Sequence, residues 1–171
     1  MRNRKIVEAD FIIDKLTKSI EEVSSGQNIS TLILPLKLDD LLGLKWQFDW
    51  ELELEKESHY VYKLVAENNP NLIQGLICLE RKPDHIYIHL LESSSFNKGS
   101  QKQFLGVAGN LVAYACKQSF HFGNDGNVSF IAKEQLINHY ERSIGAFHFG
   151  NRRMIINTNA AKILVNQYFN S

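Results

Sequence analysis

The residues of this chain that are best suited to bind a ligand form the short stretch Gln103–Ala108, which reads Gln-Phe-Leu-Gly-Val-Ala and precedes an apolar helical pattern. Gly106 and Ala108 carry little or no side chain to keep a bulky anion away from the main chain. The first N–H groups of a helix have no partner within the helix, and the helix dipole places positive charge behind them. The stretch therefore predicts a binding site for a phosphate or a diphosphate.

The overall composition indicates one globular domain, residues 1–171, with a sizeable core. Of the 171 residues, 44% are hydrophobic and 22% are charged, which is typical of a folded soluble protein. The 19 basic residues balance the 19 acidic ones, so no net charge attracts nucleic acid or anionic lipid. We therefore expect neither a nucleic-acid partner nor a membrane partner.

The cysteines and the first residues indicate in which compartment the protein lies, and the histidines bear on metal binding. Cys78 and Cys116 lie in apolar runs, which favours buried reduced thiols over a disulfide. The six histidines show no tight ligand spacing, so no metal site is predicted. Residues 1–5 resemble the start of a signal peptide, but Glu8 and Asp10 stand where its apolar region should follow, and no run is long enough to span a bilayer. We expect a cytoplasmic protein.

The first part of the chain gives mixed signals about the elements that must position the Gln103 stretch. Apolar residues at helical spacing predict an amphipathic helix over Val7–Val23. A short strand at Thr31–Leu34 and a short helix around Leu38–Leu42 are expected next. Over Trp46–Leu54 apolar and acidic residues alternate, which predicts a strand with a solvated acidic face. Alternatively, that acidic row attracts a cationic molecule such as a polyamine, an aminoglycoside or a lysine-rich peptide. Its members are Asp49, Glu51, Glu53 and Glu55.

The rest of the chain predicts an antiparallel meander followed by alternating helices and strands. Short turns join the three expected strands of the meander. Those strands are Tyr60–Ala66, Leu72–Glu80 and His85–Leu91. The elements expected afterwards are a helix over Leu105–Ser119, a strand over Val128–Ala132, a helix over Lys133–Ser143, strands over Ala146–Phe149 and Arg153–Ile156, and a helix over Asn159–Phe169.

This order of elements and two motifs resemble the GNAT superfamily of acyl-CoA-dependent N-acyltransferases. The family's turn reads Arg/Gln-x-x-Gly-x-Gly/Ala, and Gln103, Gly106 and Ala108 occupy those places. A Tyr-x-x-x-Gly-Phe ending is resembled by residues 139–147, with Tyr140 in the tyrosine position. The resemblance covers about residues 72–149. It departs from the family at Lys133, where Asn is usual, at Ala146, which displaces the Phe by one, and in a longer loop before Gln103.

The resemblance implies an α/β fold: a mixed, mostly antiparallel sheet flanked by helices, with a splay between two central parallel strands. Residues 1–45 would form the acceptor side, and residues 46–171 the sheet and the CoA-binding core. The implied cofactor is acetyl-CoA or another acyl-CoA, with its pantetheine arm in the splay and its diphosphate on the Gln103 turn. The implied contacts are Leu91, Glu92, Gln103, Phe104, Leu105, Gly106, Val107, Ala108, Gly109 and Lys133.

The implied reaction is acetyl transfer to a primary amine of a small molecule or a peptide. Tyr140 would give a proton to the departing thiolate, and Glu92 would accept the proton of the amine. Without the resemblance, Tyr140 is a core aromatic residue and Glu92 a solvated acid. Lys133 either reaches a cofactor phosphate or is an exposed lysine.

Two alternatives to catalysis remain open at this stage, and a homodimer is equally open. The first is a non-catalytic GNAT-like module that binds CoA or acyl-CoA. The second is an interaction protein whose cofactor cleft is filled by its own side chains, with Phe96 or Phe104 as candidates.

Overall fold

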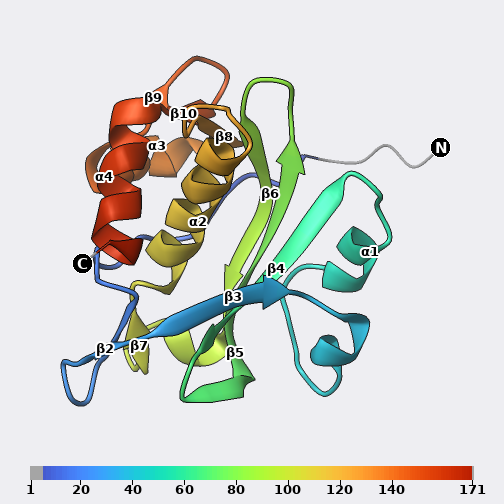
Figure 1. Cartoon of the computed structure of the whole chain (residues 1–171), viewed down its shortest axis with the longest axis vertical. Coiled ribbons are helices and arrows are strands. Elements are labelled where there is room, and N and C mark those ends of the chain that lie inside the picture. Colours follow the sequence, from blue (N-terminus) through green and yellow to red (C-terminus); the bar gives the residue numbers. More distant parts are fainter. Residues whose placement is uncertain (1–5, 171) are drawn as a thin grey trace.

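The computed structural model describes residues 6–170, and its central feature is a seven-stranded sheet in the order β3-β4-β5-β6-β8-β10-β9 (Figure 1). The strands are β3 (Thr31–Pro35), β4 (His59–Ala66), β5 (Asn69–Arg81), β6 (Ile86–Ser93), β8 (Val128–Ile131), β9 (Phe147–His148) and β10 (Arg153–Ile156). Neighbouring strands are antiparallel except for β6 and β8, which are parallel. The sheet is therefore of the mixed, mostly antiparallel type that was expected.

Helices cover both faces of this sheet. The helices α2 (Val107–His121) and α4 (Thr158–Phe169) pack side by side on one face, and α3 (Ile137–Ile144) lies near β9 and β10 (Figure 1). The short helix α1 (Trp50–Leu54) covers the opposite face of β4 and β5. Because side chains alternate along a strand, β5 sends Ile77 and Leu79 into the core under α2, and Leu76 and Cys78 into the core under α1.

A second, three-stranded sheet attaches the N-terminal part of the chain to the Gln103 turn. It consists of β1 (Ile20–Glu22), β2 (Asn28–Ile29) and β7 (Phe104–Leu105), in the order β2-β1-β7. In the β1–β7 pair, Glu21 lies opposite Leu105 and Glu22 opposite Phe104. The N-terminal segment is therefore held directly beside the start of α2.

Most expected elements are present. The meander, the long helix after Gln103, the strands β8 and β10 and the final helix form where the sequence predicts them. Short 3-10 helices form at Leu38–Leu41, Ser95–Asn97 and Glu134–Leu136, and the last of these replaces the first turn of the expected 133–143 helix. No helix within residues 6–170 is both long and apolar enough to cross a membrane.

The predicted helix over Val7–Val23 is wrong. Residues 6–19 run in extended or bent form up to β1. Phe11 and Ile13 are buried, whereas Ile12 between them is 50% exposed, which is the two-residue repeat of an extended chain. The segment is extended because its main chain pairs with residues near Ala132, as described below.

The predicted strand over Trp46–Leu54 is also wrong. Asp49 caps a helix there instead, since its Oδ1 accepts a hydrogen bond from Leu52 N at 3.1 Å. Trp50 and Glu53, three residues apart, are the buried residues of α1. The acidic row is therefore not the face of a strand, and Glu53 points into the protein.

Candidate functional site

The parallel strands β6 and β8 pair only where they begin and then diverge. Ile86 lies opposite Val128 and Tyr87 opposite Ser129, while β6 continues to Ser93 and β8 to Ile131 without further partners in each other. This is the splay that the sequence motifs implied, and it opens toward the start of α2.

The gap between these strands is filled by the chain's own N-terminal segment. Ala9 N donates to Ile131 O at 2.6 Å, and Lys133 N donates to Ala9 O at 3.1 Å, so the segment lies beside β8 as a further strand would. Toward β6, the space left between residues 7–11 and residues 88–91 is about 10 Å³. That volume is at the lower limit for a single water molecule. The gap is therefore closed beside residues 7–11.

Tyr140 is enclosed by this segment. It is fully buried, and its hydroxyl donates to the main-chain oxygen of Phe11 at 2.7 Å. The rings of Phe11 and Tyr140 lie 4.9 Å apart between centroids, and both contact Phe130. Burial raises the pKa of the Tyr140 phenol well above its ordinary value. The hydroxyl that sequence reasoning assigned to a thiolate therefore has a main-chain carbonyl as its partner.

The Gln103 turn binds a carboxylate. Gly106 N donates to Asp14 Oδ1 at 3.0 Å, and Lys102 Nζ lies 3.0 Å from Asp14 Oδ2. An anion thus lies at the start of α2, where the helix dipole favours one. Gly106 has a φ of 88°, and a Cβ at this position would overlap with the hydroxyl of the buried Thr17. The turn fits an anion, but a side chain of the N-terminal segment supplies it.

The neighbouring amides also have internal acceptors. Gln103 N donates to Phe96 O and Phe104 N to Asn97 Oδ1, each at 3.0 Å. Leu105 pairs with β1. A Cβ at Gly109 would overlap with the Tyr168 hydroxyl. An acyl-CoA therefore cannot pair with the β8 edge or with the Gly106 amide while the N-terminal segment occupies them.

Part of the turn still faces open space. Val107 and Ala108 line a cavity of about 470 Å³ together with Asp14, Glu92 and Lys102. The expected contact Leu91 is nearly buried in the core beneath α2, although it reaches the edge of this cavity. Four of the cofactor contacts that the resemblance implies, Leu91, Glu92, Val107 and Ala108, thus line one cavity.

Glu92 is a fixed, buried carboxylate. It is 5% exposed and accepts three hydrogen bonds, from Gln47 N at 2.7 Å, Phe48 N at 3.1 Å and Trp50 Nε1 at 2.9 Å. Lys98 Nζ lies 3.6 Å away. The carboxylate thus ties the segment before α1 to the end of β6, at the edge of the cavity.

Several polar contacts also join the N-terminal segment to residues that follow β8, namely Lys133, His139 and Arg152. Ile13 N donates to His139 Nε2 at 3.0 Å, which requires this nitrogen to be unprotonated, and burial lowers the pKa of His139. Lys133 Nζ lies 3.7 Å from Asp10 Oδ2, so this expected phosphate contact faces the segment instead. Arg152 pairs with Glu8 at 2.8 Å.

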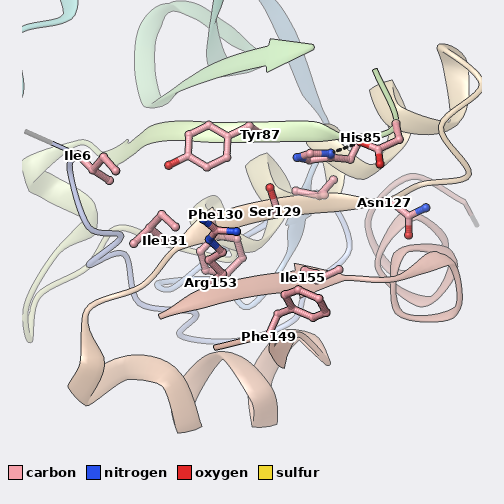
Figure 2. Close-up of a pocket in the computed structure, with 12 residues that line it drawn as sticks. Ile6, His85, Tyr87, Asn127, Ser129, Phe130, Ile131, Phe149, Arg153 and Ile155 are labelled. Carbon is pink, nitrogen blue, oxygen red and sulfur yellow. Dashed lines mark hydrogen bonds and ion pairs between the residues drawn. The ribbon is translucent and has the colours of Figure 1, made fainter. Parts of the chain in front are cut away.

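A larger cavity, of about 650 Å³, lies on the outer face of β6, β8 and β10 and contains none of the predicted site residues. Figure 2 shows Tyr87, Ser129 and Arg153 lining it, with Ile6 at its edge.

Sequence reasoning missed the residues that close the gap, namely Phe11, Asp14 and Thr17. The signal that could have found them is the pair Phe11 and Ile13, two apart and followed at once by an acid. That order suits an extended apolar segment ending at a helix N-terminus.

Comparison with known proteins places the fold. No family model and no curated protein sequence matches the chain. Among solved structures, AtaTR bound with AcCoA matches at 15% identity and a TM-score of 0.53, over 78% of this chain and 97% of that one. AtaT complexed with acetyl-methionyl-tRNAfMet matches at 16% identity and a TM-score of 0.52, over 79% of this chain and 99% of that one. A chimera of the spermidine N-acetyltransferase SpeG from Vibrio cholerae and hSSAT matches at 15% identity and a TM-score of 0.50, over 77% of this chain and 98% of that one.

At these identities the likeness concerns the fold, and it agrees with the sheet order and the splay described above. The chain has the fold of the GNAT superfamily of N-acyltransferases.

Proposed function

We propose that this protein is a GNAT-type N-acyltransferase, dependent on acetyl-CoA or another acyl-CoA, which its own segment Val7–Asp14 holds closed. One observation carries the proposal. The segment follows the path that the resemblance assigns to the cofactor, from the gap between β6 and β8 to the Gly106 amide. Its main chain pairs with the β8 side as a pantetheine arm would pair with a strand edge, and its carboxylate stands where a diphosphate would lie.

Displacement of the segment would uncover the groups that acyl transfer needs. An acyl-CoA supplies an activated thioester when it is bound. Tyr140, freed from Phe11 O, would have a hydroxyl proton to donate in the gap. The Gly106 amide, freed from Asp14, would be available to an anion. Glu92 has three donors already, so we assign it a positioning role that holds residues 47–50 at the end of β6.

The cost of displacement predicts weak cofactor binding by the intact chain. Exposing the buried side chains of Phe11 and Ile13 costs about 1.5–3 kcal/mol each. A total of about 3–6 kcal/mol would lower the apparent affinity for an acyl-CoA roughly 10²- to 10⁴-fold. An otherwise micromolar site would then bind in the millimolar range.

Calorimetric titration of acetyl-CoA into the intact chain and into Asp14→Ala tests this proposal. Asp14→Ala removes the competing carboxylate, so we expect at least about tenfold tighter binding, and Asp39→Ala, at an exposed acid remote from the turn, should leave the affinity unchanged. Thiol release in the presence of an amine panel would then report turnover. Folded Asp14→Ala without any acetyl-CoA binding would contradict the proposal.

A second candidate is a permanently closed, non-catalytic GNAT-fold module, the alternative in which the cleft is filled by the chain itself. The contact between Thr17 and Gly106 favours it, because Thr17 is only 3% exposed and blocks the turn independently of Asp14. For this candidate, Asp14→Ala and Thr17→Ala would both fold and both fail to bind acetyl-CoA. The filling residue is then Phe11 rather than Phe96 or Phe104.

The acceptor is proposed to be a primary amine of a small molecule or a peptide. The matched AtaT structure contains an acetylated aminoacyl-tRNA, which is a statement about that protein. The balanced charge of this chain favours no nucleic-acid partner, and this prediction is tested by measuring binding of bulk tRNA to the intact chain at physiological salt.

A further inference from the structure

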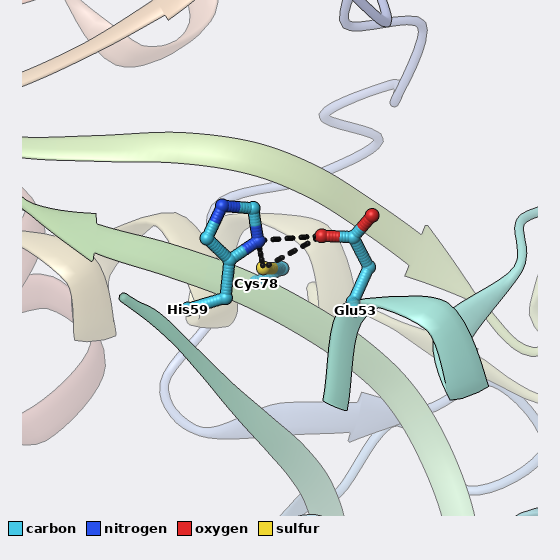
Figure 3. Close-up of side chains that lie close together, drawn as sticks. All are labelled: Glu53, His59 and Cys78. Atoms are coloured by element: carbon cyan, nitrogen blue, oxygen red, sulfur yellow. Dashed lines mark hydrogen bonds and ion pairs between the residues drawn. The ribbon is translucent and has the colours of Figure 1, made fainter. Parts of the chain in front are cut away.

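Three side chains with metal-binding atoms meet beneath α1, on the face of the sheet opposite α2. Glu53 comes from α1, His59 from the start of β4 and Cys78 from the middle of β5. Figure 3 shows the three side chains pointing toward one another. Cys78 is fully buried and Glu53 nearly so, and none of the three belongs to the N-terminal segment or to the Gln103 turn.

The distances among these atoms suit a tetrahedral metal ion. His59 Nδ1 lies 3.3 Å from Cys78 Sγ, Cys78 Sγ lies 3.6 Å from Glu53 Oε2, and His59 Nδ1 lies 2.6 Å from Glu53 Oε2. Zinc bonds of about 2.0–2.3 Å place tetrahedral ligand atoms roughly 3.3–3.7 Å apart. Two of the three separations are therefore close to the required values, and the His59–Glu53 pair would have to open by less than about 1 Å.

The arrangement does not suit a nucleophilic triad. In such a triad the acid and the nucleophile contact opposite ring nitrogens of the histidine. Here Glu53 and Cys78 both lie on Nδ1 of His59. The three groups converge on one point instead of forming a relay for a proton.

The surrounding charges form an outer layer of the kind that orients metal ligands. Lys56 Nζ lies 2.8 Å from the other oxygen of Glu53. The free Nε2 of His59 faces Glu80 Oε1 at 3.8 Å, and His89 Nε2 lies 2.7 Å from the same oxygen. At 3.8 Å the Glu80 oxygen is too far from Nε2 for a hydrogen bond, but a carboxylate behind the second nitrogen is the group that would fix the ring of a ligating histidine if it moved closer.

We propose that Glu53, His59 and Cys78 bind a thiophilic divalent cation, with Zn²⁺ the best match to the donor set. A cavity of about 580 Å³, lined by Glu53, Lys56, His59 and His89, would give the ion an entry path and leave room for a water molecule at the fourth position. Binding replaces the Cys78 thiol proton, which passes to solvent, by the metal–sulfur bond. The ion would join α1 to β4 and β5.

Titration of the intact, reduced chain with Co²⁺ tests the site, because a cobalt–thiolate bond gives a near-ultraviolet charge-transfer band. We expect the band to saturate at a single equivalent, and Zn²⁺ to remove it. Cys78→Ser should abolish the band, and the matched variant Cys116→Ser, at the other buried cysteine, should keep it. His59→Gln and Glu53→Gln should weaken binding at least about tenfold.

Three results would overturn the proposal, and the third is needed only if Cys78→Ser does not fold. One is the absence of the band from folded wild-type protein at excess Co²⁺. Another is cobalt binding without sulfur character that is lost in His89→Gln, since His59, Glu80 and His89 also lie close together and would then be the site. If Cys78→Ser fails to fold, the Co²⁺ titration of His59→Gln tests the site instead. A Co²⁺ affinity equal to that of the wild type in His59→Gln would contradict the proposal.

Discussion

Asp14 and Gly106, 92 positions apart in the sequence, are joined by a 3.0 Å hydrogen bond from the glycine N–H to the aspartate Oδ1. This bond places a side-chain anion at the helix start for which the Gln-x-x-Gly-x-Ala motif predicted a diphosphate. It connects the fold's binding motif to the N-terminal segment, and most of the predictions below follow from that connection.

The close approach of Thr17 to Gly106 makes this glycine structurally necessary. We expect Gly106→Ala to lower the free energy of unfolding by about 2–4 kcal/mol, from the overlap with Thr17 and the positive φ together. Urea denaturation measures the effect. Gly99→Ala, which has a positive φ but open space around it, should cost only about 1 kcal/mol. Equal losses in the two variants would refute the contact.

The hydroxyl of Tyr140 should contribute to stability through Phe11 O. Tyr140→Phe leaves that buried carbonyl without its partner, so we expect a loss of about 1–2 kcal/mol in the free energy of unfolding. Tyr60→Phe, at a largely exposed tyrosine, serves as the control and should change stability by less than about 0.5 kcal/mol. A Tyr140→Phe variant as stable as the wild type would mean that the segment does not occupy the gap in solution.

The contact between Ile13 N and His139 Nε2 predicts a dependence on pH. Because burial lowers the pKa of His139 below its ordinary value of 6.5, the folded state binds this proton less readily than the unfolded state. The contribution is fully present above pH 6.5 and is lost as the pH falls through the folded pKa. The pKa of His89 is lowered as well, so the loss of stability with falling pH must be compared between the wild type and a His139 variant. Between about pH 7 and pH 5, His139→Gln should lose less stability than the wild type. Parallel pH profiles would exclude a role for His139.

Glu92 should matter for the position of residues 47–50. In Glu92→Gln, one carboxylate oxygen becomes an amide donor that faces either Gln47 N, at the Oε2 position, or both Phe48 N and Trp50 Nε1, at the Oε1 position. We expect a loss of about 1–3 kcal/mol and a red shift of tryptophan fluorescence as Trp50 becomes solvated. Glu51→Gln, at an exposed neighbour, is the control. A fluorescence spectrum identical to that of the wild type would contradict the arrangement.

The parts of the fold that the sequence predicted are those with local signals. The meander has short turns between alternating strands, and the Gly106 turn precedes a long apolar helix, so both follow from neighbouring residues. The splay came from the resemblance to the GNAT superfamily rather than from periodicity.

The parts that the sequence did not predict depend on distant contacts. Residues 7–14 are extended because Ala9 pairs with Ile131 and Lys133, which lie far away in the sequence. The spacing of Phe11 and Ile13 suits an extended segment but does not identify these partners. The alternation over Trp46–Leu54 suits a strand, but Asp49 caps a helix that Trp50 anchors to Glu92. Glu53, His59 and Cys78 meet only after α1, β4 and β5 have packed together.

Hydrogen exchange at the amides of Ala9 and Ile13 is the most direct test of whether an acyl-CoA displaces the segment Val7–Asp14 from the gap between β6 and β8. Ala9 N is hydrogen-bonded to Ile131 O in the gap and Ile13 N to His139, so we expect slow exchange in the free chain, and fast exchange when Asp14→Ala is saturated with acetyl-CoA. Protection that persists in the saturated variant would contradict the proposal that acyl-CoA and residues 7–14 compete for the same space.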